Sequence, residues 1–319
     1  MNISIFCSVV IPMKIDNKDI SFVLQGPVSA SKGRVQKEGV TKQNILSIRK
    51  LFPGSEIILS TWKGQDTAGL DVDKLILLDD PGQNSVFNDG EEKKLNNNRQ
   101  LYSSHQGLRA VNTRYATKVR TDNIINGRGF VELFELFSSA PRDPEFTYLD
   151  NRIVTSSTFF ISSHIGQPVY FHKSDLFDFG ETQDLLKIWH DSLVPELYFK
   201  KQPGYKSRHP ATEQFLCLHW ISKLMDQKLP INTKAGDDAN LGPEFWEKFI
   251  TNNLIICEPH KMGLDVTDRF YKRGNIALEY DLDDWKYAAG LAGKPMDKKR
   301  LKRAFKVIEG RLLRKIIRI

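Results

Sequence analysis

The sequence predicts an α/β fold with one mainly parallel sheet flanked by helices, and three observations lead to this prediction. Short apolar runs alternate with helical segments over the first 120 residues, which is the pattern that builds a parallel sheet. The chain has 319 residues, 40% of them hydrophobic, so it is large enough to bury both faces of such a sheet. No run approaches the roughly 18 consecutive apolar residues that a transmembrane helix needs.

The first half of the chain contains the clearest secondary structure. Strands are expected at residues 20–24, 56–60, 74–78 and 115–120, where apolar runs are bounded by turn residues. A helix is expected at residues 41–51, because apolar residues recur every three positions and Pro53-Gly54 follows. These elements alternate, as the crossover connections of a parallel sheet require.

Beyond residue 125 the pattern is looser. Helices are expected at residues 130–137, 181–193 and 212–224, and strand-like segments at 147–154 and 167–180. The helix at 212–224 follows Pro210 and carries Glu213 in its first turn, where the helix dipole favours an acid. Residues 1–18 are expected to form an N-terminal extension or an extra strand.

The net charge of +7 comes from the C-terminal segment. Residues 298–319 contain ten Lys or Arg and one acid, which leaves 36 basic and 38 acidic residues in 1–297. A nucleic-acid partner is therefore not expected, since the body of the chain is nearly neutral. Residues 296–319 are predicted to form a basic amphipathic helix, whose apolar face comprises Leu301, Phe305, Ile308, Leu312 and Ile316. Such a helix either lies on an anionic membrane surface or packs its apolar face on the domain.

Cysteine usage indicates a reducing compartment. Cys7, Cys217 and Cys257 are odd in number and widely spaced, and they form no CxxC pair, so neither a disulfide framework nor a zinc site is predicted. The N-terminal apolar run has no basic residue before it, which makes it a poor secretory signal. A cytoplasmic protein is expected.

A polar segment followed by a helix and a strand is the most informative part of the sequence. The loop expected here supplies amides and a guanidinium that can hold a nucleotide and its phosphates, from Asn97, Asn98, Arg99 and Gln100. The strand at 115–120 then leads to Asp122. Ligands of open α/β sheets bind at the carboxyl ends of the strands, so these residues are expected to form a nucleotide site.

Further polar residues follow the other strands. Gln25, Gly26 and Pro27 end the first strand, where the backbone can approach a nucleotide, although an ordinary turn explains them equally well. Asp80 can bind a ribose hydroxyl or a metal, but Asp-Asp-Pro-Gly is also a turn sequence. Trp62, which ends the second strand, can stack on a base or pack in the core, and core packing is favoured. Neither G-x-G-x-x-G nor the P-loop motif is present, which disfavours a dinucleotide-binding enzyme or a P-loop kinase.

Glu213 is the candidate general base. A carboxylate at a helix start beneath an acceptor can take the proton of the attacking hydroxyl, and helix capping is its alternative role. His172 and His209 are candidate residues of the acceptor pocket, and a structural role stays open for both.

Five segments together resemble the WavE-type lipopolysaccharide-biosynthesis family: ISFVLQGP, NILSIRKLFPGSEIILSTWKG, LLDDPG, NNNRQLYSSHQGL and YATKVRTDN. The resemblance covers roughly residues 20–225. It implies a GT-A-like fold, a nucleotide-sugar donor and a role in bacterial surface polysaccharide assembly. On this basis residues 19–295 are expected to form one transferase domain, with a donor half at about 19–125 and an acceptor half at about 126–295.

Similarity to GT-A transferases implies roles for individual residues. Arg99 matches the donor-side arginine, and Asp122 matches the second acid of the Asp-x-Asp motif, which holds a divalent cation against the diphosphate. Arg120 replaces the first acid, which weakens the case for Mg or Mn, and its guanidinium can itself neutralise phosphate. Asp122 is expected to serve catalysis by stabilising the departing diphosphate.

The predicted function is the transfer of a sugar from a nucleotide sugar to a hydroxyl of lipopolysaccharide, capsule or a related glycan, with inversion favoured over retention of the anomeric configuration. The acceptor is expected to be lipid-linked or an oligosaccharide, and the protein to be peripheral on the cytoplasmic face of the inner membrane through its C-terminal helix. Two alternatives stay open. One is a sugar nucleotidyltransferase, for which Gly33-Arg34 is an imperfect match to the required loop. The other is a non-catalytic glycan-assembly protein with a degenerate donor site.

Overall fold

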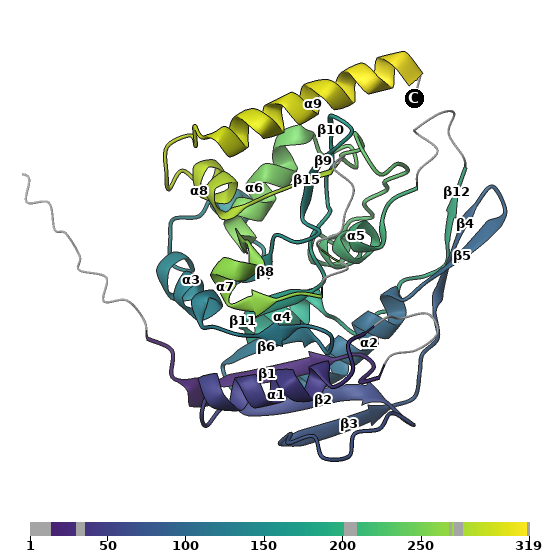
Figure 1. Cartoon of the computed structure of the whole chain (residues 1–319). Helices are drawn as coiled ribbons and strands as arrows, with labels where there is room; N and C mark the ends of the chain where they lie inside the picture. Colours follow the sequence, from purple (N-terminus) through teal and green to yellow (C-terminus); the bar gives the residue numbers. More distant parts are fainter. Residues whose placement is uncertain (1–13, 30–35, 201–208, 268–269, 271–276, 318–319) are drawn as a thin grey trace, which may run out of the picture.

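A seven-stranded sheet forms the centre of the computed structural model, which describes residues 14–29, 36–200, 209–267, 270 and 277–317 (Figure 1). Its strands are β1 (Ile20–Gln25), β2 (Glu56–Trp62), β3 (Lys74–Leu78), β6 (Tyr115–Arg120), β8 (Ile153–Ser156), β11 (Phe177–Glu181) and β13 (Leu254–Cys257). They are ordered β13-β8-β11-β6-β1-β2-β3. Of these seven, β11 is the reversed strand, antiparallel to both β6 and β8. The predicted mainly parallel α/β sheet is confirmed.

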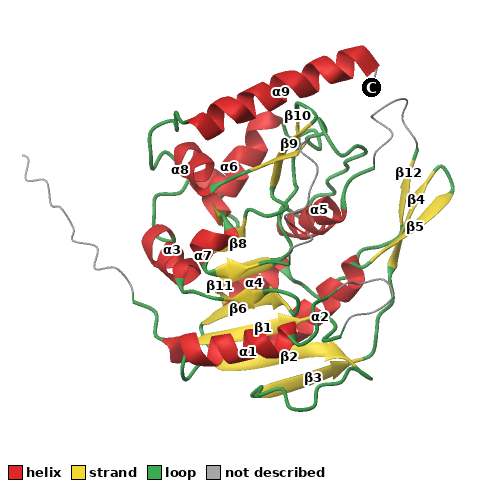
Figure 2. Cartoon of the chain, in the orientation of Figure 1, coloured by secondary structure: helices red, strands yellow, loops and turns green. Residues whose placement is uncertain are grey.

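The helices lie on both faces of this sheet and beyond its β13 edge (Figure 2). They are α1 (Val40–Leu51), α2 (Asn97–Arg109), α3 (Gly129–Phe137), α4 (Thr182–Ile188), α5 (Thr212–Leu224), α6 (Pro243–Asn253), α7 (Pro259–Met262), α8 (Leu282–Ala288) and α9 (Lys298–Ile317). Short 3-10 turns occur at Asn17–Asp19 and Pro144–Phe146. Among the described residues no helix is both long enough and apolar enough to cross a membrane.

The core forms on both faces because successive side chains of a strand point in opposite directions. On β1, Phe22 packs against Phe52 at the end of α1 and against Phe130 of α3. Val23 points to the other face, which α2 crosses at Gly107. A Cβ at Gly107 would lie 2.4 Å from the Val23 Cγ1, so this close crossing requires glycine. The central strand β1 is buried at all six positions because both of its faces are covered, whereas the edge strand β3 keeps Leu75 and Leu77 exposed.

Three smaller sheets surround the central one. The first has the order β12-β4-β5 and reaches away from the body on the right of Figure 1; its strands are β4 (Asn84–Asn88), β5 (Glu91–Leu95) and β12 (Leu197–Phe199). The second comprises β10 (Gln167–Pro168), β9 (Ile161–His164) and β15 (Ala277–Glu279). The third pairs β14 (Leu264–Asp265) with β7 (Ile124–Ile125). Except for β10, which lies in the strand-like segment expected at 167–180, the strands of these sheets were not expected from the sequence.

Most expected elements are found, and three differ. The polar segment that begins at Asn97 is the first turn of α2, not a loop, because Asn84 of β4 caps the helix by accepting from the Asn97 N–H at 3.1 Å. The helix expected at 181–193 ends at Ile188, and the segment expected as a strand at 147–154 contains only the start of β8. Of residues 1–18, where an N-terminal extension or an extra strand was expected, 1–13 lie outside the described residues, and the rest leads into the 3-10 turn at Asn17–Asp19.

Candidate active site

The chain changes direction in the sheet next to β1. From β1 it continues to β2 and β3 on one side, and it later returns to place β6 on the other side. The connections that leave β1 and β6 therefore diverge, which opens a crevice at the carboxyl ends of these strands. A cavity of about 740 Å³ lies there. Its walls include Gln25, Gly26, Pro27, Trp62, Asp80, Arg99, Gln100, Arg120, Asp175 and Glu213.

The end of β1 brings backbone to the cavity. Gly26 has a φ of 109°, which other residues rarely adopt, and its N–H donates to the Ser60 carbonyl at 3.1 Å. The Gln25 side chain is buried and accepts from the Ser103 Oγ at 2.9 Å, so α2 fixes it in place. Residues 25–27 therefore form a turn and also line the cavity, so the two roles considered from the sequence do not exclude each other.

Arg99 and Asp80 form a two-pronged ion pair on the cavity wall. The Arg99 Nε donates to both carboxylate oxygens of Asp80, at 2.8 and 3.0 Å, and its Nη1 donates to the Asn96 Oδ1 at 3.0 Å. The hydrogen bond from Arg99 is the main reason that the Asp80 pKa lies below its ordinary value. Asp80 also accepts from the Gly82 N–H, as a turn aspartate does. The Arg99 guanidinium and the Asp80 carboxylate are thus fixed in position, and both remain partly exposed to solvent and to a ligand in the cavity.

The first turns of α2 and α5 are joined across the cavity. The Asn97 side chain donates to the Thr212 carbonyl at 3.0 Å, and the Gln100 side chain donates to the Asp175 carbonyl at 2.9 Å. Asn97 is buried and does not line the cavity, whereas Gln100 does. These bonds bring the Arg99 side of the cavity close to the Glu213 side.

Arg120 lines the cavity between two carboxylates. It donates to both oxygens of Asp122, at 3.0 and 2.9 Å, and its Nη1 lies 3.8 Å from the Asp175 Oδ2. Burial lowers the pKa of Arg120, but these carboxylates outweigh that effect and hold its pKa above the ordinary value. Asp122 is buried behind Arg120 and does not line the cavity.

The residues around Asp122 do not fit a divalent cation. Both of its carboxylate oxygens accept from Arg120, whose positive charge would oppose a metal ion at the same position. Throughout the described part of the chain, no group of three or more His, Cys, Asp or Glu side chains is arranged to hold a metal.

Glu213 faces the cavity from the first turn of α5 and has the properties of a base. Burial raises its pKa to about 7, and the nearby charge of Asp175 adds to this effect. Its Oε2 lies 3.8 Å from the Nε2 of His172. Burial lowers the pKa of His172 to about 3, so this imidazole is neutral and does not stabilise a charged Glu213. A carboxyl group that titrates near neutral pH is suited to proton transfer.

The two histidines lie outside the cavity. His172 is buried, and its Nδ1 is 2.8 Å from the Phe159 carbonyl. This contact fixes the imidazole ring, whose Nε2 lies beside the Glu213 carboxyl group. His209 stacks on Phe199 and Phe215, with ring centroids 6.2 and 6.3 Å away. Those two phenylalanines belong to a second cavity.

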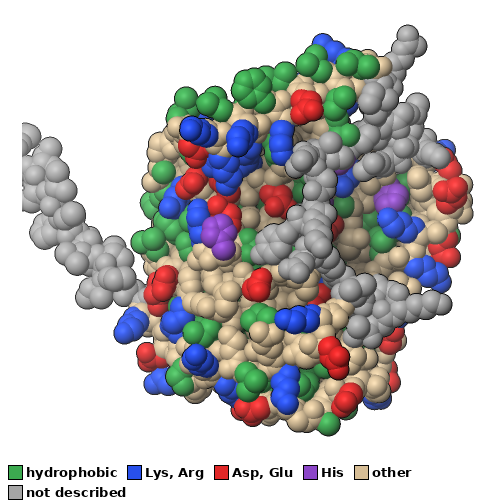
Figure 3. Space-filling view, viewed as in Figure 1, with side chains coloured by type: hydrophobic (Ala, Val, Ile, Leu, Met, Phe, Trp, Pro, Cys, Tyr) green, Lys and Arg blue, Asp and Glu red, His purple; other side chains and the backbone are tan. Residues whose placement is uncertain are grey.

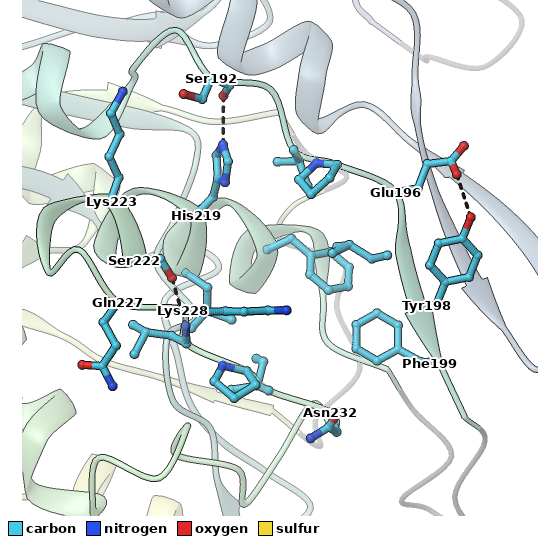
Figure 4. A pocket seen from close by; sticks show the side chains of 18 of the residues that line it. Ser192, Glu196, Tyr198, Phe199, His219, Ser222, Lys223, Gln227, Lys228 and Asn232 are labelled. Atoms are coloured by element: carbon cyan, nitrogen blue, oxygen red, sulfur yellow. Dashed lines mark hydrogen bonds between the residues drawn. The ribbon is translucent and has the colours of Figure 1, made fainter.

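The second cavity, of about 840 Å³, lies between α5 and β12 (Figure 4). It combines the apolar rings of Phe199 and Phe215 with polar side chains such as those of His219, Gln227 and Asn232. In Figure 4 the labelled polar residues and Phe199 surround the open space in front of α5. An aromatic surface beside amide and imidazole groups is chemically suited to a sugar chain, which presents both C–H faces and hydroxyls.

Trp62 and Asp175 line the first cavity against the sequence-based expectation. Of the two roles considered for Trp62, core packing was favoured over stacking on a base, but Trp62 is the last residue of β2 and is partly exposed in the cavity wall. Asp175 precedes β11, and the register pairs Phe177 of β11 with Val119 of β6. Because β11 is antiparallel, its amino-terminal end reaches the same edge as the carboxyl end of β6. The available signal was the polar HKSD sequence before an apolar strand, but its use required knowing the strand direction.

A family model described as WavE lipopolysaccharide synthesis matches residues 20–318. The match begins at the first residue of β1 and extends through α9, so it includes both cavities and nearly the whole chain. No curated protein matches the chain closely enough to count as a relative.

Proposed function

This chain belongs to the WavE lipopolysaccharide synthesis family, and we propose that within lipopolysaccharide synthesis it is a glycosyltransferase with a GT-A-like fold. It moves a sugar from a nucleotide-sugar donor to a hydroxyl of lipopolysaccharide, capsule or a related surface glycan. The observation that carries this proposal is the cavity at the carboxyl ends of β1, β2 and β6. There, cationic groups suited to a diphosphate share one space with a carboxyl group whose pKa is near 7.

The donor occupies the side of the cavity formed by β1, β2 and α2. Trp62 offers a ring on which a base can stack, and Asp80 can accept from the ribose hydroxyls. Arg99 and Arg120 bind the diphosphate through further N–H groups, because a guanidinium has five N–H donors and the paired carboxylate takes two of them. Arg120 thereby neutralises charge at the position where related transferases place a metal. Asp122 acts through Arg120, which it holds in place and orients.

The reaction is a single in-line displacement with inversion. The acceptor oxygen forms a bond to the anomeric carbon while the bond from that carbon to the diphosphate oxygen breaks. Glu213 takes the proton of the acceptor hydroxyl, and the electron pair of the broken bond leaves on the diphosphate, where Arg99 and Arg120 stabilise it.

The acceptor approaches from the side of α5, and the cavity between α5 and β12 binds sugars farther along its chain. Phe215 of this cavity lies two residues after Glu213, so one helix connects the two sites. Phe199→Ala is expected to raise the KM for a glycan acceptor while leaving the KM for the donor unchanged. A rise in both would mean that the cavity does not serve the acceptor alone.

The protein acts on the cytoplasmic face of the inner membrane as a peripheral protein. Cys217 and Cys257 are buried free thiols, which is consistent with a reducing compartment.

The test is a turnover assay with a panel of sugar nucleotides and delipidated lipopolysaccharide oligosaccharide. A transferase releases nucleoside diphosphate and enlarges the oligosaccharide by one sugar. Consumption of nucleoside triphosphate with sugar phosphate would instead indicate a nucleotidyltransferase, whose loop at 30–35 lies outside the described residues. Absence of nucleotide binding would indicate a non-catalytic assembly protein.

A further inference from the structure

The helix α9 is oriented opposite to an ordinary amphipathic surface helix, whose apolar face packs on the core. Its outer row is apolar and exposed: Leu301 60%, Phe305 69%, Ile308 52%, Leu312 54% and Ile316 77%. The row that faces the body, at the same helical spacing, contains Arg300, Arg303, Val307 and Gly310. Figure 3 shows hydrophobic side chains along the outer edge of α9, at the top of the molecule, and charged side chains beneath it.

An ion-pair cluster holds the first half of α9. The buried carboxylate of Asp281 accepts from Arg300 at 2.6 Å through each of its oxygens, and it also lies 2.6 Å from Lys299 and 3.1 Å from Arg303. Asp281 is fixed in turn as the cap of α8, because it accepts from the Asp284 N–H at 2.8 Å. The basic side of α9 is therefore anchored to the body.

A close backbone crossing holds the second half. A Cβ at Gly310 would lie 2.6 Å from the Gly166 N, and one at Gly166 would lie 2.4 Å from the Val307 carbonyl oxygen. Gly166 is in the turn between β9 and β10, and its φ is +67°. The two glycines let α9 rest directly on this turn. With both halves fixed, the helix cannot rotate its apolar row toward the core.

We propose that the outer face of α9 is a docking face for an anionic phospholipid bilayer. The helix carries nine basic residues and one acid, and Lys298, Lys302 and Lys315 are exposed beside the apolar row. The apolar row enters the boundary of the acyl chains, and these lysines contact the phosphate headgroups. A second copy of the chain fits this face less well, since two such helices would bring like charges together.

The docking face goes beyond the transferase activity and does not depend on it. It gives the bilayer a fixed position on the body, because α9 cannot rotate. A lipid-linked acceptor would therefore meet the enzyme in one orientation.

The test is sedimentation with vesicles of phosphatidylcholine, with and without phosphatidylglycerol. The full chain binds the anionic vesicles, and binding weakens steeply with added salt. The double variant Phe305→Ser/Leu312→Ser binds them at least tenfold more weakly, although its charge is unchanged. The matched control is Leu46→Ser/Leu136→Ser, which changes two similarly exposed leucines on α1 and α3 (57% and 66%) and binds as the wild type does.

Two further readouts separate the outcomes. Melting temperature and binding of nucleoside diphosphate should be the same in the serine variant and the wild type, so a fall in either would show damage to the fold and require milder Ala substitutions. Equal vesicle binding by the wild type and a correctly folded serine variant overturns the proposal. The proposal is also overturned if neither protein binds vesicles and light scattering finds that the wild type is a dimer and the serine variant a monomer. That result would assign the face to contact with a second copy of the chain.

Discussion

Replacing Glu213 by Gln tests the proposed base with the smallest change in shape. The side chain keeps its volume and its place in the first turn of α5, but it loses the ability to accept a proton. Transfer to the acceptor should fall by a factor on the order of 100 to 10,000, which is the usual contribution of general-base catalysis. The affinity for nucleoside diphosphate should stay the same, because Glu213 acts on the acceptor.

The pH dependence follows from the raised pKa of about 7. About one-tenth of Glu213 is ionised at pH 6 and about nine-tenths at pH 8, so the wild-type rate should rise about tenfold between these values. The variant should lack this rise. The free energy of unfolding changes in the opposite direction. Between about pH 4.5 and 7 the Glu213 carboxyl group keeps its proton in the folded state and releases it in the unfolded state. Glu213 therefore lowers the free energy of unfolding as pH rises through this range. Above pH 7 the variant should therefore be at least as stable as the wild type.

The assay is the initial rate of nucleoside diphosphate release with acceptor present, across this pH range, together with thermal unfolding at each pH. Glu244→Gln is the matched control, because Glu244 occupies the first turn of α6 after a proline but is exposed and lines neither cavity. Wild-type turnover in Glu213→Gln, or an unchanged pH profile, would refute the role of base and leave Glu213 with helix capping alone.

The remaining predictions concern the donor site. Arg99→Ala should weaken nucleoside diphosphate binding at least about tenfold, or about 1.4 kcal/mol, in isothermal titration. Arg114→Ala, at the opposite end of β6, should leave binding unchanged. Equal effects of the two substitutions would mean that binding depends on the net charge of the protein and not on a contact of Arg99. Asp122→Ala should lower turnover at least about tenfold by releasing Arg120, and it should also cost about 1–3 kcal/mol in urea unfolding, because Arg120 loses its hydrogen-bonded carboxylate and keeps only Asp175, 3.8 Å away. Wild-type stability in this variant would contradict the buried ion pair. Chelation of divalent cations should leave turnover unchanged, since both oxygens of Asp122 are engaged by Arg120; a loss that Mg or Mn restores would show that a metal binds.

The strands and helices of the first half were predictable because each is a local pattern. The helix at 212–224 and the strand at 74–78 have the expected bounds, since both depend on apolar spacing and on turn residues at their ends. The start of α2 was not predictable, because its cap comes from Asn84, thirteen residues upstream on β4. Strand β11 likewise gives no sign of its direction in its own sequence.

The candidate site was predicted in part for the same reason. Gln25 and Asp80 could be found because residues that follow parallel strands meet at one edge of the sheet, and Arg99 because it belongs to a conspicuous polar segment. Asp175 could not, because it reaches that edge from the antiparallel strand. The orientation of α9 was also beyond the sequence. Its apolar row predicts an amphipathic helix, but only the contacts of Asp281 and Gly310 show that this row faces outward.

The central claim is that the cavity at the carboxyl ends of β1 and β6 binds the nucleotide part of a sugar donor. Its most direct test is thermal unfolding with a panel of nucleoside mono-, di- and triphosphates, compared between the wild type and Arg99→Ala. One nucleoside diphosphate should stabilise the wild type, by about 2.7 kcal/mol at a hundred times its Kd, and should stabilise Arg99→Ala clearly less at the same concentration. Stabilisation by triphosphates alone, by no nucleotide, or equally in both proteins would contradict the central claim.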